Sequence, residues 1–329
     1  MAMDGNHTLA ANAEVTGPIS RGASYSFHNW FNRRGWRNII IASPYAWLVA
    51  FFLVPFLIVV AMSLATRAGT SPPFAFADTW PFIDTGNIAR LFQDPVYVRA
   101  YLTSIYNAAI ATALCLLLGY PMALGIARMR GTWRNILLLL VILPFWTSFL
   151  LRVYAWIGLM GTNSWFNKSL TAIVNGIIPA DLAFRSIPMM NTNFAVVLVM
   201  VYSYLPFMIL PLYANLERLD GTLNEAAMDL GSKPWQVFRD VTLPLSLPGI
   251  IAGGLLVFIP ASGEVIIPSL VGDASDPMIG RVINDEFSAA RDWPMASAVA
   301  VALLLMLVVP MMLYHRFESR AQAGGEAKS

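Results

Sequence analysis

The sequence is poor in charge and in cysteine. Charged residues occupy only 12% of its 329 positions, whereas hydrophobic residues occupy 57%. This composition excludes an ordinary soluble domain, because about a quarter of the residues in such domains are charged. The single cysteine, Cys115, excludes an intrachain disulfide and a cysteine-based metal site. The chain is therefore expected to reside in a bilayer.

Six long apolar runs are present. Each has about 20 residues or more, the length at which a helix crosses a hydrocarbon core of roughly 30 Å. The runs are continuous, which favours helices over the alternating pattern of barrel strands. They cover Pro44–Ala65, Thr103–Ala127, Asn135–Met160, Asn193–Leu216, Leu245–Val271 and Met295–His315. The sequence thus predicts an all-α polytopic membrane protein with six transmembrane helices in one domain, residues 39–316.

Lys and Arg are distributed unevenly between the two sides of these spans. Short cytoplasmic loops carry more of them than external loops do. With the N-terminus inside, 13 lie in inner segments and 7 in outer segments, and the turn at 128–134 alone holds three. We therefore predict that both termini are cytoplasmic, with residues 1–38 and 317–329 as tails, the first of them flexible.

A polar loop, residues 217–244, separates the fourth and fifth spans. Leu223–Leu230 and Pro234–Asp240 can form short helices, and Asn224 is a plausible cap for the first. Gly231 can take the left-handed conformation that ends a helix, and proline at 234 suits the first turn of the next. The pattern fits a helix–turn–helix unit that docks a partner, or an ordinary amphipathic loop on the inner membrane surface.

The same loop carries a spaced motif. Glu225, Ala226, Ala227, Asp229 and Gly231 form its first part, and Val241, Leu243 and Pro244 follow after nine further residues. Glu225 and Asp229 lie one helical turn apart and share a face, while the two alanines leave the backbone open to close approach. On the predicted cytoplasmic side, before the penultimate span, this motif resembles the signature of permease subunits of type I ABC importers. Val241 stands where that family usually has isoleucine.

The resemblance implies a MetI-like fold in which a cytoplasmic coupling helix, between the fourth and fifth transmembrane helices, sits in a cleft of an ATPase. The chain itself has no Gly-x-x-x-x-Gly-Lys-[Ser/Thr] phosphate loop. We therefore expect no catalytic residue, no metal site and no cofactor in this chain, with ATP and Mg²⁺ bound by partner ATPase subunits. No nucleic-acid partner is expected either.

Two ionisable acidic or basic side chains fall inside the predicted spans, Arg152 and Glu264. A charge in lipid is costly, so such side chains face a partner or a polar cavity. Both lie at a similar predicted depth, toward the outer side. Three interpretations stay open: the two form an ion pair, Glu264 faces the substrate path and meets a cation, or they are exposed at the interface.

Aromatic and acidic side chains gather near the same predicted level. The aromatic residues are Trp146, Tyr154, Trp156, Tyr202 and Tyr204. They fit core packing with an interfacial belt, or a cation-π lining for an ammonium substrate. In the last outer loop, Asp and Glu outnumber Arg, which suggests an acidic mouth that attracts cations or docks a binding protein.

Beyond the docking motif, residues 40–316 resemble the putrescine/spermidine permease family. The matching stretches are Leu143–Ser148, Arg152–Trp156, Tyr204–Tyr213, Phe258–Pro260 with Gly263 and Glu264, Met278–Gly280 and Arg291–Pro294. The resemblance implies a bacterial plasma-membrane importer built from two related permeases, two ATPase subunits and an external polyamine-binding protein. An importer for another solute, such as ferric iron or thiamine, and an ion-coupled secondary transporter are the alternatives.

Overall fold

The computed structural model of the chain describes residues 34–76, 84–177 and 184–326. These residues are mostly helical, with one two-stranded antiparallel ribbon. The chain divides into two compact units, residues 1–58 and 59–329. Residues 1–33 of the predicted tail lie outside the described residues, and helix α2 begins at Arg34, before the predicted domain boundary at residue 39.

The first apolar run is a single long helix. It comprises α2 (Arg34–Leu48), a π-helical turn η1 (Val49–Leu53) and α3 (Val54–Ser63). Pro55 has no N–H for the carbonyl four residues back, and the helix widens next to it. Ile40–Ser63 is long and apolar enough to cross a membrane, which confirms the first predicted span.

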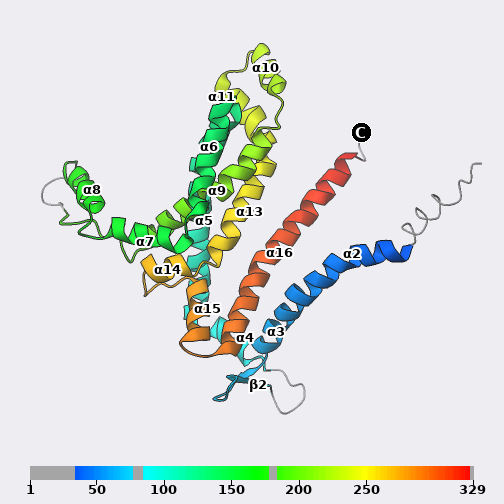
Figure 1. Ribbon diagram of the computed structural model, residues 1–329, viewed down its shortest axis with the longest axis vertical. Coiled ribbons are helices and arrows are strands. Elements are labelled where there is room, and N and C mark those ends of the chain that lie inside the picture. Colours follow the sequence, from blue (N-terminus) through cyan, green and yellow to red (C-terminus); the bar gives the residue numbers. More distant parts are fainter. Residues whose placement is uncertain (1–33, 77–83, 178–183, 327–329) are drawn as a thin grey trace, which may run out of the picture. The chain divides into compact units, whose positions relative to one another are not determined.

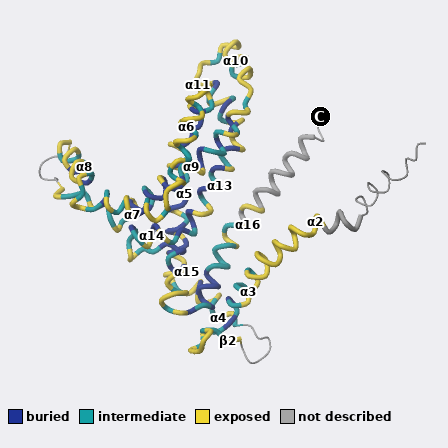
Figure 2. Tube along the Cα trace, viewed as in Figure 1, coloured by how far each residue is buried: buried dark blue, intermediate teal, exposed yellow. Residues whose placement is uncertain are grey.

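The core of the second unit lies where three helices meet. α5 (Pro95–Arg128), α9 (Asn193–Leu216) and α13 (Leu247–Ser262) pack against one another (Figure 1). Asp94 caps the start of α5, since its side chain accepts a hydrogen bond from the Val96 N–H at 3.0 Å, and Pro95 follows as the first helical residue. The buried residues of these helices form a continuous cluster (Figure 2).

Two glycines allow α13 to approach α9 closely. A Cβ added at Gly249 would lie 2.7 Å from the Asn215 Cβ, and one at Gly253 would lie 3.1 Å from the Met208 carbonyl oxygen. Small residues four positions apart give this contact in membrane helices, where packing replaces the hydrophobic effect.

The third apolar run is not one straight helix. α6 (Thr132–Ile142) leads into a 3₁₀ turn, η2 (Leu143–Trp146), and α7 (Phe149–Met160) leaves at a bend of 91°. Pro144 interrupts the ladder, and Thr147 and Ser148 are extended, with ψ of 150° and 136°. The predicted span over Asn135–Met160 is therefore a bent pair of helices and not one straight helix.

The fifth run is interrupted as well. The chain bends by 63° at Ser246, beside Pro248 in the first turn of α13. α13 then ends at Ser262, and a separate helix α14 (Ile266–Val271) follows three non-helical residues. The predicted span over Leu245–Val271 is thus divided between α13 and α14, and Gly263 and Glu264 lie outside helices.

The last run is α16 (Trp293–Glu326), which extends into the predicted tail at 317–329. Shorter elements connect the long ones: β1 (Thr66–Arg67), β2 (Phe74–Ala75), α4 (Gly86–Gln93), α8 (Trp165–Asn175) and α15 (Ile279–Ser288). Among the described residues, three helices could cross a membrane singly, two bent pairs could do so together, and α16 adds the shorter apolar stretch Trp293–Val308. The predicted all-α polytopic fold is confirmed.

Neighbouring glycines give a matched test of the α9–α13 contact. Gly253→Ala places a methyl against the Met208 backbone, whereas Gly254→Ala meets only the Thr112 Cγ2 at 3.9 Å. Both substitutions gain about 1 kcal/mol of helix propensity, and overpacking costs about 1–3 kcal/mol. We expect the thermal unfolding midpoint of the purified protein to fall for Gly253→Ala only. Equal midpoints for the two variants would contradict the close approach.

Candidate functional site

The predicted docking motif begins on helix α10 (Gly221–Asp229), which carries Glu225, Ala226, Ala227 and Asp229. The cap of this helix is Asp220, not Asn224, which lies inside it. The Asp220 carboxylate accepts a hydrogen bond from the Thr222 N–H at 3.0 Å, and this bond lowers the pKa of Asp220 below its usual value. The cap is therefore present at neutral pH and weakens as the pH falls through that lowered pKa.

The end of α10 is built as the sequence predicts. Gly231 has a φ of +88°, the left-handed conformation that glycine adopts without strain. The Gly231 N–H donates to the Met228 carbonyl at 2.9 Å, and the Ser232 N–H donates to the Ala227 carbonyl at 3.1 Å. This pair of bonds is a Schellman motif, which satisfies carbonyls that the helix leaves free. Pro234 then opens α11 (Pro234–Val237).

The chain after α11 ties the docking motif to the membrane helices. It continues through a π-helical turn η4 (Phe238–Thr242) and α12 (Leu243–Leu245). Phe238 meets the Tyr120 ring of α5 edge-on at 5.7 Å, and the Tyr120 hydroxyl lies 2.9 Å from the Ser246 Oγ. These contacts connect the segment to α5 and to the start of α13.

Two polar contacts complete the anchorage. The Thr242 hydroxyl donates to the Asn224 Oδ1 at 3.2 Å, which joins η4 back to α10. Arg134, in the first turn of α6, forms an ion pair of 2.6 Å with Glu217 at the end of α9. Both ends of the segment formed by residues 217–244 are therefore held against helices of the bundle.

The opposite face of the segment is open. Glu225, Ala226, Asp229 and Gly231 are exposed, and Ala227 is half-buried. Figure 2 shows most of α10 as exposed. Two large apolar side chains accompany the motif, Leu230 at 89% exposure and Trp235 at 67%. Large apolar residues in a polar loop are a sequence signal for a partner surface. Leu230 and Trp235 give this signal, although neither belongs to the motif.

Glu264 lies in the break between α13 and α14 and is 9% exposed. Its Oε1 accepts hydrogen bonds from the N–H groups of Ile266 at 3.0 Å and Ile267 at 3.4 Å, and its Oε2 accepts one from the Tyr204 hydroxyl. The carboxylate thus caps α14, where the helix dipole favours negative charge. All of these donors are neutral, so the charge itself is not cancelled by a described basic side chain.

Arg152 does not pair with Glu264 among the described residues. Its guanidinium carbon lies 5.8 Å from the ring centre of Phe145 and 5.7 Å from that of Phe149, a cation-π arrangement. Its Nε and Nη1 are buried without hydrogen-bond partners among the residues that the structure describes. The possible ion pair between the two charges is therefore absent.

The predicted aromatic residues differ in exposure and in their contacts. Trp146 and Tyr154 are 75% and 56% exposed. Trp156 packs edge-on against Tyr202 at 5.5 Å, and only Tyr204 reaches Glu264. The structure brings together Tyr204 and Glu264 and leaves Arg152, Trp146, Tyr154 and Trp156 outside that contact.

The acidic residues of the last outer loop are engaged within the chain. Asp276 accepts hydrogen bonds from the Arg99 Nε and the Thr103 hydroxyl, both at 3.0 Å. The remaining contacts are Asp292 with Arg90 at 3.3 Å, Glu286 with the Tyr97 hydroxyl at 2.7 Å, Asp285 with Arg281 at 3.7 Å, and Asp273 with the Ser275 N–H at 2.8 Å. These contacts tie α4 and α5 to α15 and α16, so the loop does not present the free acidic mouth that the sequence suggested.

The chain resembles known proteins along most of its length. Residues 115–322 match the family described as "Binding-protein-dependent transport system inner membrane component". The spermidine/putrescine transport system permease protein PotB of Haemophilus influenzae is 41% identical over 280 residues, covering 85% of this chain and 93% of that protein. The protein of that name from Escherichia coli is 38% identical over 277 residues, covering 84% and 96%.

A solved structure shares the fold. The match is to the bacterial alginate ABC transporter in complex with an alginate pentasaccharide-bound periplasmic protein, with a TM-score of 0.62 and 17% identity. It covers 88% of this chain and 98% of that chain.

Proposed function

Because this chain belongs to the family of binding-protein-dependent transport system inner membrane components, we propose that it is the permease subunit of an ATP-driven polyamine importer. The observation that carries the cargo assignment is the extent of similarity to the spermidine/putrescine permeases, 41% identity across 85% of the chain. Alternating access, driven by a separate ATPase, moves the substrate. The absence of a phosphate loop from the sequence supports a separate energy source.

The coupling residues of this proposal are Glu225, Ala226, Ala227, Asp229 and Gly231. Their support is the arrangement of the 217–244 segment, which is open on one face and anchored to α5, α6 and α13 on the other. A partner that binds ATP and Mg²⁺ pulls on the open face, and the anchors pass the movement to the bundle. The partner ATPase faces the cytoplasm, so the 217–244 segment that it contacts is cytoplasmic. Since this segment lies between the fourth and fifth of six spans, both termini lie on the same side as it does.

Glu264 and Tyr204 are the proposed cation contact. Within the described part of the chain the carboxylate is bonded only to neutral donors, so it keeps a negative potential for an ammonium group of the cargo. A sister permease and an external polyamine-binding protein complete the assembly. The binding protein selects between putrescine and spermidine before either reaches this chain.

Reconstitution with the partner subunits tests the cargo. We expect a binding protein loaded with putrescine or spermidine to stimulate ATP hydrolysis above the level given by the unloaded protein. Vesicles containing the complex should accumulate the labelled polyamine only when ATP is supplied on the cytoplasmic side. Stimulation by a protein loaded with thiamine or ferric iron, and not by one loaded with polyamine, would refute the assignment.

Two substitutions that introduce a positive charge test the coupling surface. Glu225→Lys, or Gly231→Arg at the exposed turn, should lower ATPase co-purification and transport by at least about tenfold, as loss of a central contact does. Membrane insertion should not change, because both residues are exposed. Arg130→Glu, another exposed site in a neighbouring polar turn, is the control. Full transport by Glu225→Lys and Gly231→Arg would rule out the docking role.

Two conservative variants separate charge from packing at Glu264. Glu264→Gln keeps an oxygen that can cap α14 but removes the charge, whereas Tyr204→Phe keeps the charge and removes one donor. At limiting putrescine we expect transport to fall by about tenfold for Glu264→Gln, the loss of roughly 1.4 kcal/mol of interaction, and less for Tyr204→Phe. Normal transport by Glu264→Gln would exclude a cation contact there.

A further inference from the structure

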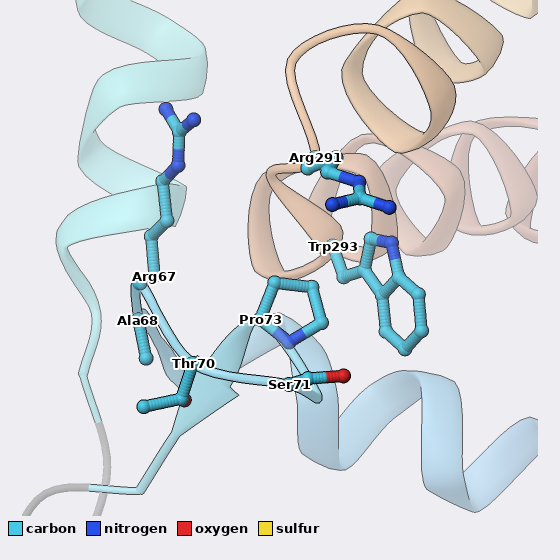
Figure 3. A pocket seen from close by; sticks show the side chains of 8 residues that line it. Arg67, Ala68, Thr70, Ser71, Pro73, Arg291 and Trp293 are labelled. Atoms are coloured by element: carbon cyan, nitrogen blue, oxygen red, sulfur yellow. The ribbon is translucent and has the colours of Figure 1, made fainter.

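A cavity of about 440 Å³ lies between the β1–β2 ribbon and the turn that precedes α16. The ribbon side consists of residues 67–71 and Pro73, and the other side consists of Arg291 and Trp293. Figure 3 shows the Arg291 guanidinium and the Trp293 indole on one wall, facing the loop of Thr70, Ser71 and Pro73. The lining is therefore cationic and aromatic, with the Ser71 hydroxyl opposite, whereas the Thr70 hydroxyl already donates to the Pro72 carbonyl at 3.0 Å.

The two arginines of the cavity differ in what they bind. The Arg67 Nη2 donates to the Ala290 carbonyl oxygen at 2.5 Å, so this side chain holds the turn in place. Arg291 is exposed and forms no ion pair with a described acidic residue. Each neighbouring acid of the turn already has an intrachain donor: Asp285, Glu286 and Asp292. Among the residues that the structure describes, the charge left over at this surface is positive.

The backbone of the turn fixes Arg291 in an unusual conformation. Its φ is +53°, a left-handed value that side chains other than Gly, Asn and Asp rarely adopt. The neighbours enforce it, because the Asp292 N–H donates to the Glu286 carbonyl at 2.9 Å and the Asp292 carboxylate caps α16 through the Met295 N–H at 3.1 Å. A strained residue held by its surroundings is a sign of a functional surface.

The turn lies beyond the apolar part of α5. Glu286 is bonded to Tyr97 and Asp292 to Arg90, and both partners precede the predicted start of the second span at Thr103. Tyr97 is six residues before Thr103, a distance of about 9 Å along a helix. At this position the turn is more accessible to a soluble protein in the external space than to the lipid phase.

We infer that this cavity is a socket for an acidic side chain of the external binding protein, with Arg291 as its charge partner. The inference rests on the proposed function, which supplies the orientation and the binding protein. A carboxylate entering between Arg291 and the Ser71 hydroxyl finds a cation and a neutral donor in one place. Such contacts at a docking surface mainly set partner choice and association rate.

The test uses the reconstituted complex and measures the concentration of loaded binding protein that gives half-maximal ATPase stimulation. We expect Arg291→Glu to raise it by about tenfold or more and Arg291→Lys to change it little. Lys168→Glu, a charge reversal at an exposed residue of α8, is the matched control and should match the wild type. A Glu or Asp to Lys change on the docking face of the binding protein should restore the response of Arg291→Glu.

Salt and lipid composition separate an ion pair with the binding protein from a contact with a lipid headgroup. Added NaCl should weaken the wild-type response more than that of Arg291→Gln, because one ion pair is missing in the variant. Nanodiscs of phosphatidylcholine alone, compared with discs containing phosphatidylglycerol, test a lipid headgroup as the occupant. An effect of Arg291→Glu seen only with the anionic lipid would overturn the inference, as would equal half-maximal concentrations for Arg291→Glu and Lys168→Glu.

Failure of the proposed function has a different signature. The wild-type response to each loaded binding protein reports the cargo, whereas the ratio of Arg291→Glu to wild type reports the socket. That ratio can be measured with whichever binding protein stimulates the wild type. Impermeant maleimide labelling of Thr70→Cys in a Cys115→Ala background checks that the ribbon is external, and labelling from the cytoplasmic side alone would overturn the inference.

Discussion

A hydrocarbon core offers no hydrogen bonds, so every break in a membrane helix must be satisfied from within the protein. The break between α13 and α14 shows how this chain meets that requirement. The Glu264 carboxylate accepts hydrogen bonds from the first two N–H groups of α14 and from the Tyr204 hydroxyl of α9. A backbone position that would be costly in lipid is thereby stabilised, and the same atoms place a negative charge inside the bundle.

Local chemistry determines which features the sequence could predict. Gly231 and Pro234 act on their own backbone, so the turn between α10 and α11 could be located from residue type alone. The apolar runs also depend on residue type alone, so the sequence located the six hydrophobic stretches although it did not fix how each one bends. The cap of α10 was misassigned because Asn224 and Asp220 are both good caps, and the choice depends on where α10 begins.

Features that depend on packing were beyond the sequence. Pro144 lacks an N–H and so favours a break within Asn135–Met160, but residue type does not fix the size of the bend, which is 91°. Arg152 and Glu264 have similar predicted depth, yet depth does not fix direction around a helix axis, and the two charges find different neighbours. The acidic residues of the last outer loop looked free in the sequence, because their partners, Arg90, Tyr97 and Arg99, are 177 to 202 positions away along the chain.

The contact between α9 and α13 has a mechanical consequence. At Gly253 an added Cβ would lie 2.9 Å from the Met208 Sδ and 3.1 Å from the Met208 carbonyl oxygen, so α13 and α9 leave no room for a larger residue and cannot slide past each other there without a clash. The two helices therefore have no room to shift against each other at this level. The chain changes direction instead at non-helical residues, Thr147–Ser148 before α7 and Gly263–Val265 before α14.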